Sequence, residues 1–275
     1  MKFLNKNYII GIDIGGSKII AALVKGARVF HKIKIPMPKN KKDFFSKLEK
    51  IIGELIKKAG GKQNIRGIGC GIGGALDLEK GIILSWSNVK FLDGLNIKNW
   101  LKKEFNREVK IDNDSKCFTR GEYLFGVGKD YKNVVGITLG TGVGGGIIIN
   151  GKMIYGANGS AGEIGHMIIN NGKDLEEATV KQMRKSKFSK MAAKEFEKNL
   201  GIGLANIINI LDPEAIIIGG GAAKTTGAFI LKARKISKKF IVFPQAEKNV
   251  KILNGKLGEN AGTIGAAALF YSQNI

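Results

Sequence analysis

Cysteine, histidine and proline are all scarce in this sequence. Its 275 residues include two cysteines, two histidines and four prolines. Cys70 and Cys117 stand alone, without Cys-x-x-Cys spacing, which predicts buried thiols and excludes a disulfide framework or a cysteine zinc site. No apolar run approaches the ~18 residues of a membrane span, and Met1–Asn7 lacks a signal-peptide apolar region. We therefore expect a cytoplasmic protein that does not enter a membrane.

Acidic residues are also few. Lysine and arginine number 45 against 23 aspartates and glutamates, which gives a formal net charge of +22. A basic field attracts polyanions, including nucleic acid. The lysines, however, fall singly or in short clusters, with no recognition-helix pattern and no basic stripe interleaved with aromatic residues. We interpret the charge as a solvated surface and expect no nucleic-acid partner.

Two glycine-rich stretches share one design. Residues 8–24 run from an apolar strand into Gly15–Lys18 and at once into a second strand, and residues 136–151 repeat this around Thr138–Gly142. Each predicts two strands joined by a tight turn whose N–H groups and hydroxyls suit a phosphate. One copy alone is as typical of a hairpin without a ligand as of a hairpin that binds phosphate, but the repeat favours phosphate binding. A strand on both sides of the turn excludes a P-loop and a dinucleotide-binding loop, which open a helix.

Acidic residues stand at informative places near these motifs. Asp13 lies on the first strand, where a carboxylate can reach a hydrated Mg²⁺. A later strand is predicted to end at Ile111 and helical spacing begins at Ser115, so Asn113 and Asp114 lie at a strand-to-helix junction. Such residues are typical helix caps. Glu163 and His166 lie three apart among small residues, where a structural histidine is the usual interpretation.

Apolar spacing predicts helices over residues 44–56, 95–105, 180–200 and 202–211, the third including Phe188. Trp100 has core spacing, whereas Trp86 lies in a loop and remains open as a sugar-stacking residue. A buried strand from Ala215 runs into a third glycine turn, Gly219–Gly221. The last segment is rich in small residues and predicts a helix that packs closely.

These motifs together resemble the sugar kinase and actin superfamily, and within it the ROK family of repressors, open reading frames and kinases. The resemblance extends over nearly the whole chain in the family's order. It implies an α/β, two-lobe, actin-like ATPase fold of the ribonuclease H-like type, with an ATP and sugar cleft between the lobes. We expect residues 1–112 to form a small N-terminal lobe, joined by a C-terminal helix over 259–275, and residues 113–258 to form a large lobe.

The resemblance also implies an activity and a set of site residues. It implies an ATP- and Mg²⁺-dependent hexose kinase, with glucose as the first choice of hexose and a homodimer as the assembly. Asp114 would be the catalytic base. The residues implied to bind the sugar are Asn113, Asp114, Glu163, His166, Glu176 and Gly74. Those implied to bind ATP and its phosphates are Asp13 (also near Mg²⁺), Gly15, Gly16, Ser17, Lys18, Thr138, Gly140, Thr141, Gly142, Gly219, Gly220 and Gly221.

The chain departs from the family pattern in two places. Gly73 replaces a proline in a loop that lines the sugar cleft. The cysteine cluster that completes a zinc site with the family's histidine is absent after His166, so we expect no zinc and a loop anchored by Ile168 and Ile169. With the cluster deleted, Glu176 aligns with the family's sugar-binding glutamate, and Glu177 does so if the deletion falls one residue later. A plain helix-start carboxylate is nearly as well supported.

Two alternatives remain open. Fructose, mannose or an N-acetylhexosamine could replace glucose, since no residue separates them. A non-catalytic, sugar-sensing regulator is the alternative of another class. Regulators of this family carry a helix-turn-helix ahead of the first phosphate turn, where this sequence has about ten residues. The presence of Asp114 also favours the enzyme.

Overall fold

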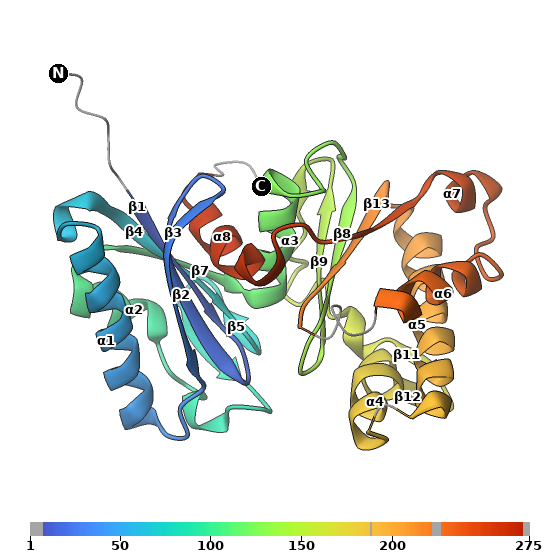
Figure 1. Cartoon of the computed structure of the whole chain (residues 1–275), viewed down its shortest axis with the longest axis horizontal. Helices are drawn as coiled ribbons and strands as arrows, with labels where there is room; N and C mark the ends of the chain where they lie inside the picture. Colours follow the sequence, from blue (N-terminus) through green and yellow to red (C-terminus); the bar gives the residue numbers. More distant parts are fainter. Residues whose placement is uncertain (1–7, 188, 222–226, 272–275) are drawn as a thin grey trace. The chain divides into compact units, whose positions relative to one another are not determined.

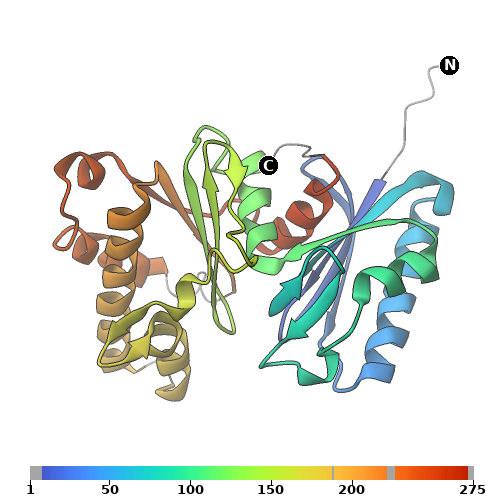
Figure 2. The ribbon, with the colours of Figure 1, turned by 180° about the vertical axis from the view of Figure 1, so that it is seen from behind.

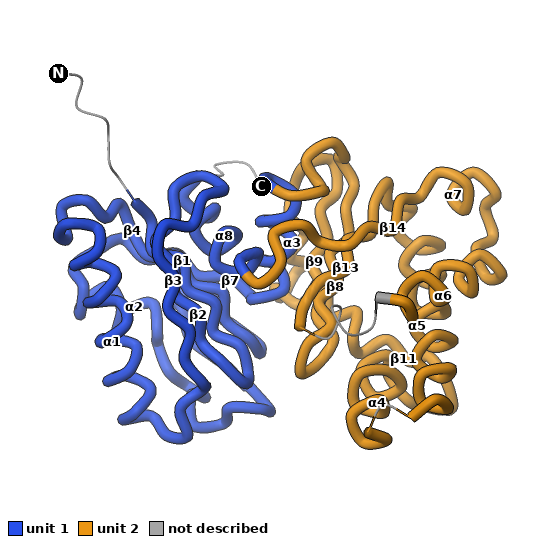
Figure 3. Tube along the Cα trace, viewed as in Figure 1, with its two compact units in different colours: residues 1–125, 260–275 blue, residues 126–259 orange. Residues whose placement is uncertain are grey.

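The protein is described by a computed structural model that covers residues 8–187, 189–221 and 227–271. Phe188 and residues 272–275, for which helix was expected, lie outside these ranges, as do the first seven residues. The chain forms two compact units, the first comprising residues up to Phe125 and from Asn260 on, the second Gly126–Glu259 (Figure 3). The helix after residue 113, α3 (Asp114–Phe125), therefore belongs to the first unit and not to the 113–258 segment as expected, because it packs on α8 (Ala261–Ala268).

Each unit contains a five-stranded sheet of the same design (Figure 1). The strand orders are β3-β2-β1-β4-β7 and β10-β9-β8-β13-β14. In each sheet three antiparallel strands are followed by two that run parallel to the third. This repeated order confirms the predicted α/β, two-lobe class. The strands are β1 (Tyr8–Ile14), β2 (Lys18–Lys25), β3 (Arg28–Pro36), β4 (Ile65–Ile72), β7 (Glu108–Asn113), β8 (Val134–Leu139), β9 (Val143–Ile149), β10 (Lys152–Met153), β13 (Ala215–Gly219) and β14 (Lys251–Asn254).

Helices cover both faces of the first sheet. On one face, α1 (Lys41–Lys58) and α2 (Ile97–Phe105) lie side by side, as Figures 1 and 2 both show. Asn40 caps α1 by accepting a 2.9 Å hydrogen bond from the Asp43 N–H. The apolar side chains of α1, spaced three and four residues apart, are buried on the isoleucine-rich sheet. A two-stranded ribbon, β5 (Ala75–Asp77) and β6 (Ile82–Ser85), precedes α2.

On the opposite face, α8 (Ala261–Ala268) approaches the strands at backbone distance. A Cβ atom on Gly69 of β4 would lie 1.9 Å from the Ala266 carbonyl oxygen, and one on Gly11 of β1 would lie 2.0 Å from that of Thr263. Only glycine leaves room for the helix at these two strand positions. α3 (Asp114–Phe125) packs beside α8 on this face. The predicted close packing of the C-terminal segment is confirmed.

The second unit corrects one helix prediction. Residues 180–200 and 202–211 are not two helices; α5 (Lys190–Leu211) is continuous across residue 201, and the hydroxyl of Ser189 caps its start. Gly201 does not end the helix, because it lies against Ala233 of α6 (Gly227–Ser237) in a close helix contact. Before α5 come a π-helical turn, Glu177–Lys181, and the short α4 (Gln182–Lys185). The unit also contains α7 (Pro244–Asn249) and a ribbon of β11 (Ile168–Asn170) and β12 (Lys173–Asp174).

Both cysteines are buried, as predicted. Burial, together with the charge of Asp13, raises the pKa of the Cys70 thiol, and burial raises the pKa of the Cys117 thiol as well. Neither thiol is therefore a nucleophile at neutral pH. Within the described ranges, no helix is both long enough and apolar enough to cross a lipid bilayer.

Candidate functional site

The first glycine turn joins β1 and β2 in a tight hairpin, as predicted. Pairing of the two strands continues to Ile14 and Ile19, and the Gly15 N–H closes the turn on the Lys18 carbonyl oxygen at 3.0 Å. Asp13 stands half-buried at the carboxyl end of β1. A Cβ atom on Gly262 of α8 would lie 2.6 Å from its carboxylate. The Asp13 carboxylate and the turn thus lie at the same end of the sheet.

The carboxyl ends of three parallel strands bring three of the predicted sugar residues, Gly74, Asn113 and Asp114, to this end. Asp13 of β1 pairs in register with Gly71 of β4, and Ile72 of β4 with Asn113 of β7. The loop after β4 and the start of α3 therefore meet at one edge of the sheet. In open α/β sheets this edge is the usual place for ligands.

The two aspartates of the Asp112-Asn113-Asp114 sequence have different surroundings. Asp112 is buried, and its Oδ2 pairs with Nη2 of the buried Arg120 at 2.7 Å. Asp114 is half-buried and opens α3, where its Oδ1 accepts the Ser115 N–H at 2.8 Å. The Asp112–Arg120 pair was not predicted from the sequence. The available signal was an arginine eight residues after an aspartate.

Asn113 both caps the helix and reaches the neighbouring loop. Strand β7 continues through Asn113, two residues beyond its predicted end. The Asn113 amide oxygen accepts the N–H groups of Ser115 and Lys116 at 3.0 and 3.3 Å, so the capping interpretation holds for this residue. Its amide nitrogen lies 3.5 Å from the Gly74 carbonyl oxygen. The side chain therefore ties α3 to the loop after β4.

The loop at Gly73 and Gly74 is held without the family's proline. The Gly73 N–H donates to the Ile14 carbonyl oxygen at 3.1 Å. Trp86, only 5% exposed, covers both glycines, and a Cβ atom on Gly73 would lie 2.5 Å from its ring. Trp86 is therefore a core residue that supports the loop. Trp100 packs with Phe45 and Phe105, as its spacing predicted.

In the second unit, β8 and β9 form the predicted central hairpin. The Gly140 N–H donates to the Gly142 carbonyl oxygen at 2.9 Å across the turn. Strand β13 runs parallel to β8, with Gly219 opposite Thr138. The third glycine turn, in which Gly220 has a φ of +94°, therefore begins beside the first strand of the hairpin. Residues 222–226, which follow this turn, lie outside the described ranges.

Glu176 lies on the central hairpin turn. Its Oε2 accepts the Val143 N–H at 2.8 Å, and its Oε1 pairs with the Lys181 ammonium group at 2.8 Å. This hydrogen bond to Glu176 raises the pKa of Lys181. A Cβ atom on Gly142 would lie 2.1 Å from Oε2, so a larger residue there would displace the Glu176 carboxylate. The Glu176–Val143 contact was not predicted, because no local sequence pattern relates residues 33 positions apart.

Arg184 contacts the same turn through its guanidinium group. Nη1 donates to the Thr141 carbonyl oxygen at 3.0 Å, and Nη2 donates to the Gly140 carbonyl oxygen. Figure 1 shows the α4 segment near the tip of the β8–β9 hairpin. One helical segment, residues 176–185, therefore holds the turn through three charged side chains. Neither Lys181 nor Arg184 was a predicted site residue.

His166 is paired with an aspartate of the β11–β12 ribbon. Its Nδ1 lies 3.0 Å from Asp174 Oδ2, and Asp174 Oδ1 accepts the Glu177 N–H at 2.7 Å. The hydrogen bond to Asp174 raises the pKa of His166. Partial burial raises the pKa of Asp174, but the bonds from Glu177 and His166 outweigh it, and that pKa is lowered. Glu163, the residue before the helical turn that contains His166, is exposed.

The ribbon occupies the place of the missing cysteine cluster. Of its two expected anchors, Ile169 packs on the core, but Ile168 is 65% exposed, because successive residues of a strand face opposite sides. The prediction for Ile168 was wrong. Among the described residues, no group of three or more histidine, cysteine or acidic side chains is arranged to hold a metal ion.

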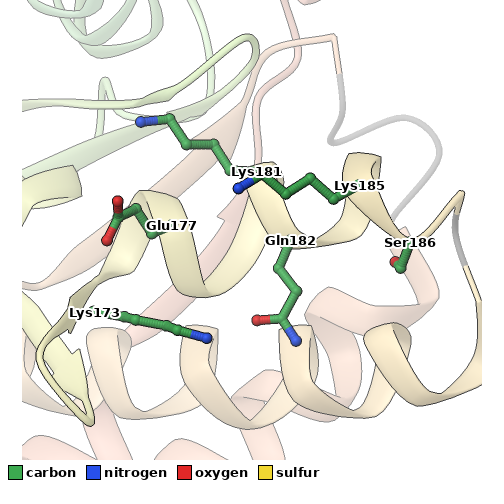
Figure 4. A pocket seen from close by; sticks show the side chains of 6 residues that line it. All are labelled: Lys173, Glu177, Lys181, Gln182, Lys185 and Ser186. Carbon is green, nitrogen blue, oxygen red and sulfur yellow. The ribbon is translucent and has the colours of Figure 1, made fainter.

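An open cavity of about 390 Å³ lies beside this segment (Figure 4). Glu177, Lys181 and Lys185 on its wall are four residues apart and come from successive helical turns. We interpret the cavity as the solvated face of that segment. The side chains that line it are Lys173, Glu177, Lys181, Gln182, Lys185 and Ser186.

Comparison with known proteins shows a full-length relationship. The family model described as "ROK family" matches residues 9–180 and 170–273. A glucokinase of Halalkalibacterium halodurans is 29% identical over 324 aligned residues, which cover 98% of this chain and 97% of the relative. This alignment is longer than the 275-residue chain, so the relative carries segments that this chain lacks.

The relatives include both enzymes and regulators. A xylose repressor of Caldicellulosiruptor bescii is 28% identical over 97% of this chain and 79% of its own length. Among solved structures, a ROK family glucokinase from Streptomyces griseus, in complex with glucose and AMPPNP, is 25% identical with a TM-score of 0.78. That similarity covers 96% of this chain and 98% of the other.

Proposed function

Because the chain belongs to the ROK family, we propose that it transfers the γ-phosphoryl group of ATP to a hydroxyl group of a hexose. Such a protein is a phosphotransferase with an alcohol group as acceptor. Glucose, phosphorylated at O6, is the first choice of substrate, supported by the glucokinase relatives. The observation that carries the proposal is the edge of the first sheet, which gathers Asp13, Gly74, Asn113 and Asp114.

The surroundings of Asp114 support its role as the general base. Asp112 is buried and paired with Arg120, so Asp114 is the half-buried carboxylate of this motif. We propose that Asp114 accepts the proton of the attacking hydroxyl group while Asn113 orients the sugar. The Ser115 N–H bond to Asp114 fixes the carboxylate before the substrate arrives. Phosphoryl transfer depends mainly on such positioning and on charge stabilisation.

The glycine turns support phosphate binding within each unit. The proposed donors are Gly15–Lys18 in the first unit and Thr138, Gly140, Thr141 and Gly142 in the second, with Gly219–Gly221 beneath the adenosine. The half-buried carboxylate of Asp13 is the hard oxygen ligand that Mg²⁺ prefers, directly or through water. Bound Mg²⁺ would neutralise charge on the phosphates. Glu163 and His166 are proposed sugar ligands, with no zinc beside them.

The proposed roles make a direct prediction for Asp114. Asp114→Asn keeps an oxygen for the Ser115 N–H but cannot accept a proton, so kcat should fall by ~10²–10⁴. The dissociation constant for glucose should stay within a few-fold. Hexose-dependent ADP formation and calorimetric glucose titration measure the two effects. Asp43→Asn, at the exposed start of α1, is the control and should keep wild-type kcat. Retention of most of kcat in Asp114→Asn would remove Asp114 from the mechanism.

Two alternatives are separated by the same assays. Preferred turnover of fructose, mannose or an N-acetylhexosamine over glucose would change only the substrate. Hexose binding without any ATP turnover would identify a sugar-sensing regulator, the class to which the repressor relative belongs. We also propose a homodimer in the cytoplasm, which sedimentation of the purified protein and cell fractionation would test.

A further inference from the structure

Arg184 is a charged residue whose position the proposed mechanism does not explain. It lies in α4, and its guanidinium group donates to two successive carbonyl oxygens, those of Gly140 and Thr141. In a trans peptide group, the C=O and the following N–H point in opposite directions. The N–H groups of Thr141 and Gly142 therefore point away from Arg184. Two successive donors face the same side of the turn, an arrangement that binds anions.

The far end of the turn is fixed from the same segment. Glu176 accepts the Val143 N–H at 2.8 Å and is itself held by Lys181 at 2.8 Å. The turn contains two glycines, which lose much conformational freedom when they are ordered. Because Arg184 and Glu176 already order the turn, binding of a ligand does not have to reduce this conformational freedom. The backbone of residues 140–143 is thus set in one conformation by the 176–185 segment.

We propose that Arg184 is a positioning residue for the binding of ATP. Its guanidinium group fixes two peptide planes, so that the Thr141 and Gly142 N–H groups together bind a phosphate group of the nucleotide. This inference rests on the proposed kinase function. The positive charge of Arg184 on the carbonyl oxygens also polarises both peptide groups, which makes their N–H groups stronger donors. Arg184 donates to the backbone of the turn, so in this proposal its effect on the nucleotide is indirect.

The planar fork of arginine matters for this role. Two Nη atoms reach two carbonyl oxygens at once, which a lysine ammonium group on a flexible stem does not reproduce. Arg184→Lys therefore keeps the charge and loses the geometry, while Arg184→Met loses both. Lys185, the next residue of α4, is exposed and lines the solvated cavity. Lys185→Met removes one charge from the same helical segment and is the matched control.

The test is calorimetric titration of each variant with ATP and with adenosine, followed by steady-state kinetics. Arg184→Met should raise the ATP dissociation constant about tenfold or more, as loss of a hydrogen-bonded charge does. Adenosine affinity and the KM for hexose should stay within twofold. Arg184→Lys should recover only part of the loss, and Lys185→Met should match the wild type. Thermal unfolding identifies any variant that fails to fold. If Arg184→Met does not fold, the ATP dissociation constant of Arg184→Lys tests the positioning role.

The possible results separate this inference from the proposed function. A wild-type protein that binds no ATP would overturn both. Wild-type ATP binding with an unchanged ATP dissociation constant in Arg184→Met would overturn the positioning role and leave the kinase proposal standing. Equal losses in Arg184→Met and Lys185→Met, or full recovery in Arg184→Lys, would show that charge alone acts and would also overturn it. An equal loss of adenosine and ATP affinity would overturn it as well.

Discussion

At the scale of single residues, burial assigns different roles to identical side chains. Asp112 and Asp114 are two residues apart, yet only Asp112 enters the core, where Arg120 neutralises it. A buried carboxylate that lost this partner would be strongly unfavourable, so Asp112 serves the structure. Asp114 opens a helix, whose N-terminus favours the negative charge.

The neighbouring residues Glu176 and Glu177 also differ in their surroundings. Glu176 is held against the central turn by Val143 and Lys181, whereas Glu177 is exposed. If Glu176 also binds the sugar, Glu176→Gln should raise the KM for hexose about tenfold, as loss of a charged hydrogen bond does. Glu177→Gln is the control and should leave this KM unchanged. Steady-state kinetics with each substrate varied in turn gives both values.

The opposite pattern would reassign the residue. A rise in the KM for ATP with an unaltered KM for hexose in Glu176→Gln would show that Glu176 serves only the turn. A rise in the KM for hexose in Glu177→Gln instead would place the sugar ligand one residue later. Sequence alone could not decide this, because the contact with Val143 depends on how the π-helical turn at Glu177–Lys181 packs on the hairpin.

At the scale of elements, the sequence predicted those strands, turns and helices that depend on neighbouring residues alone. The two hairpins follow from apolar runs broken by glycine, and α1 follows from its three- and four-residue spacing. The division of α5 was mispredicted because Gly201 is a helix breaker by propensity alone, and its packing on α6 overrides that preference. Long-range contacts, such as those of Arg184, leave no periodic trace in the sequence.

The close approach of α8 to the first sheet makes a prediction about stability. Gly69→Ala would place a Cβ atom 1.9 Å from the Ala266 carbonyl oxygen, so we expect a loss of about 1–3 kcal/mol in the free energy of unfolding. Gly53→Ala is the matched control, because it lies within α1 and a Cβ atom there meets no atom within 4 Å. This control should gain about 0.5–1 kcal/mol. Denaturant unfolding measures both, and equal stabilities would contradict the packing described for α8.

The β11–β12 ribbon should respond to pH through His166. Asp174 raises the pKa of His166 above its ordinary value of 6.5, so the folded protein favours the charged imidazolium. The contribution of this pair to stability is therefore complete below pH 6.5 and is lost as the pH rises through the raised pKa. The His166 side chain is 62% exposed, so the change in overall stability should be small.

An NMR titration of the imidazole protons tests this pairing directly. His166 should titrate above pH 6.5 in the wild type and at a lower pH in Asp174→Asn, because the variant removes the charged partner. The chain has one other histidine, and His31→Gln assigns the two resonances. An unchanged His166 titration in Asp174→Asn would mean that the pair does not form in solution.

At the scale of the whole molecule, one sheet design occurs twice. Each sheet presents a glycine hairpin and the carboxyl ends of parallel strands, one with Asp13 and Asp114, the other with the turn held by Arg184. The return of the C-terminal segment, predicted over residues 259–275, was inferred from family resemblance, since no local pattern indicates which sheet a helix will cover. Its described part from Asn260 on lies in the first unit. The net charge of +22 attracts anions in general and selects no substrate.

We propose above that this chain phosphorylates a hexose with ATP. The most direct measurement is mass spectrometry of the products after the purified protein is incubated with ATP, Mg²⁺ and, separately, glucose, fructose, mannose and the N-acetylhexosamines. We predict a hexose phosphate equimolar with ADP, formed fastest from glucose and bearing the phosphate at O6. The absence of a sugar phosphate from every hexose, with the protein folded and ATP bound, would contradict the claim.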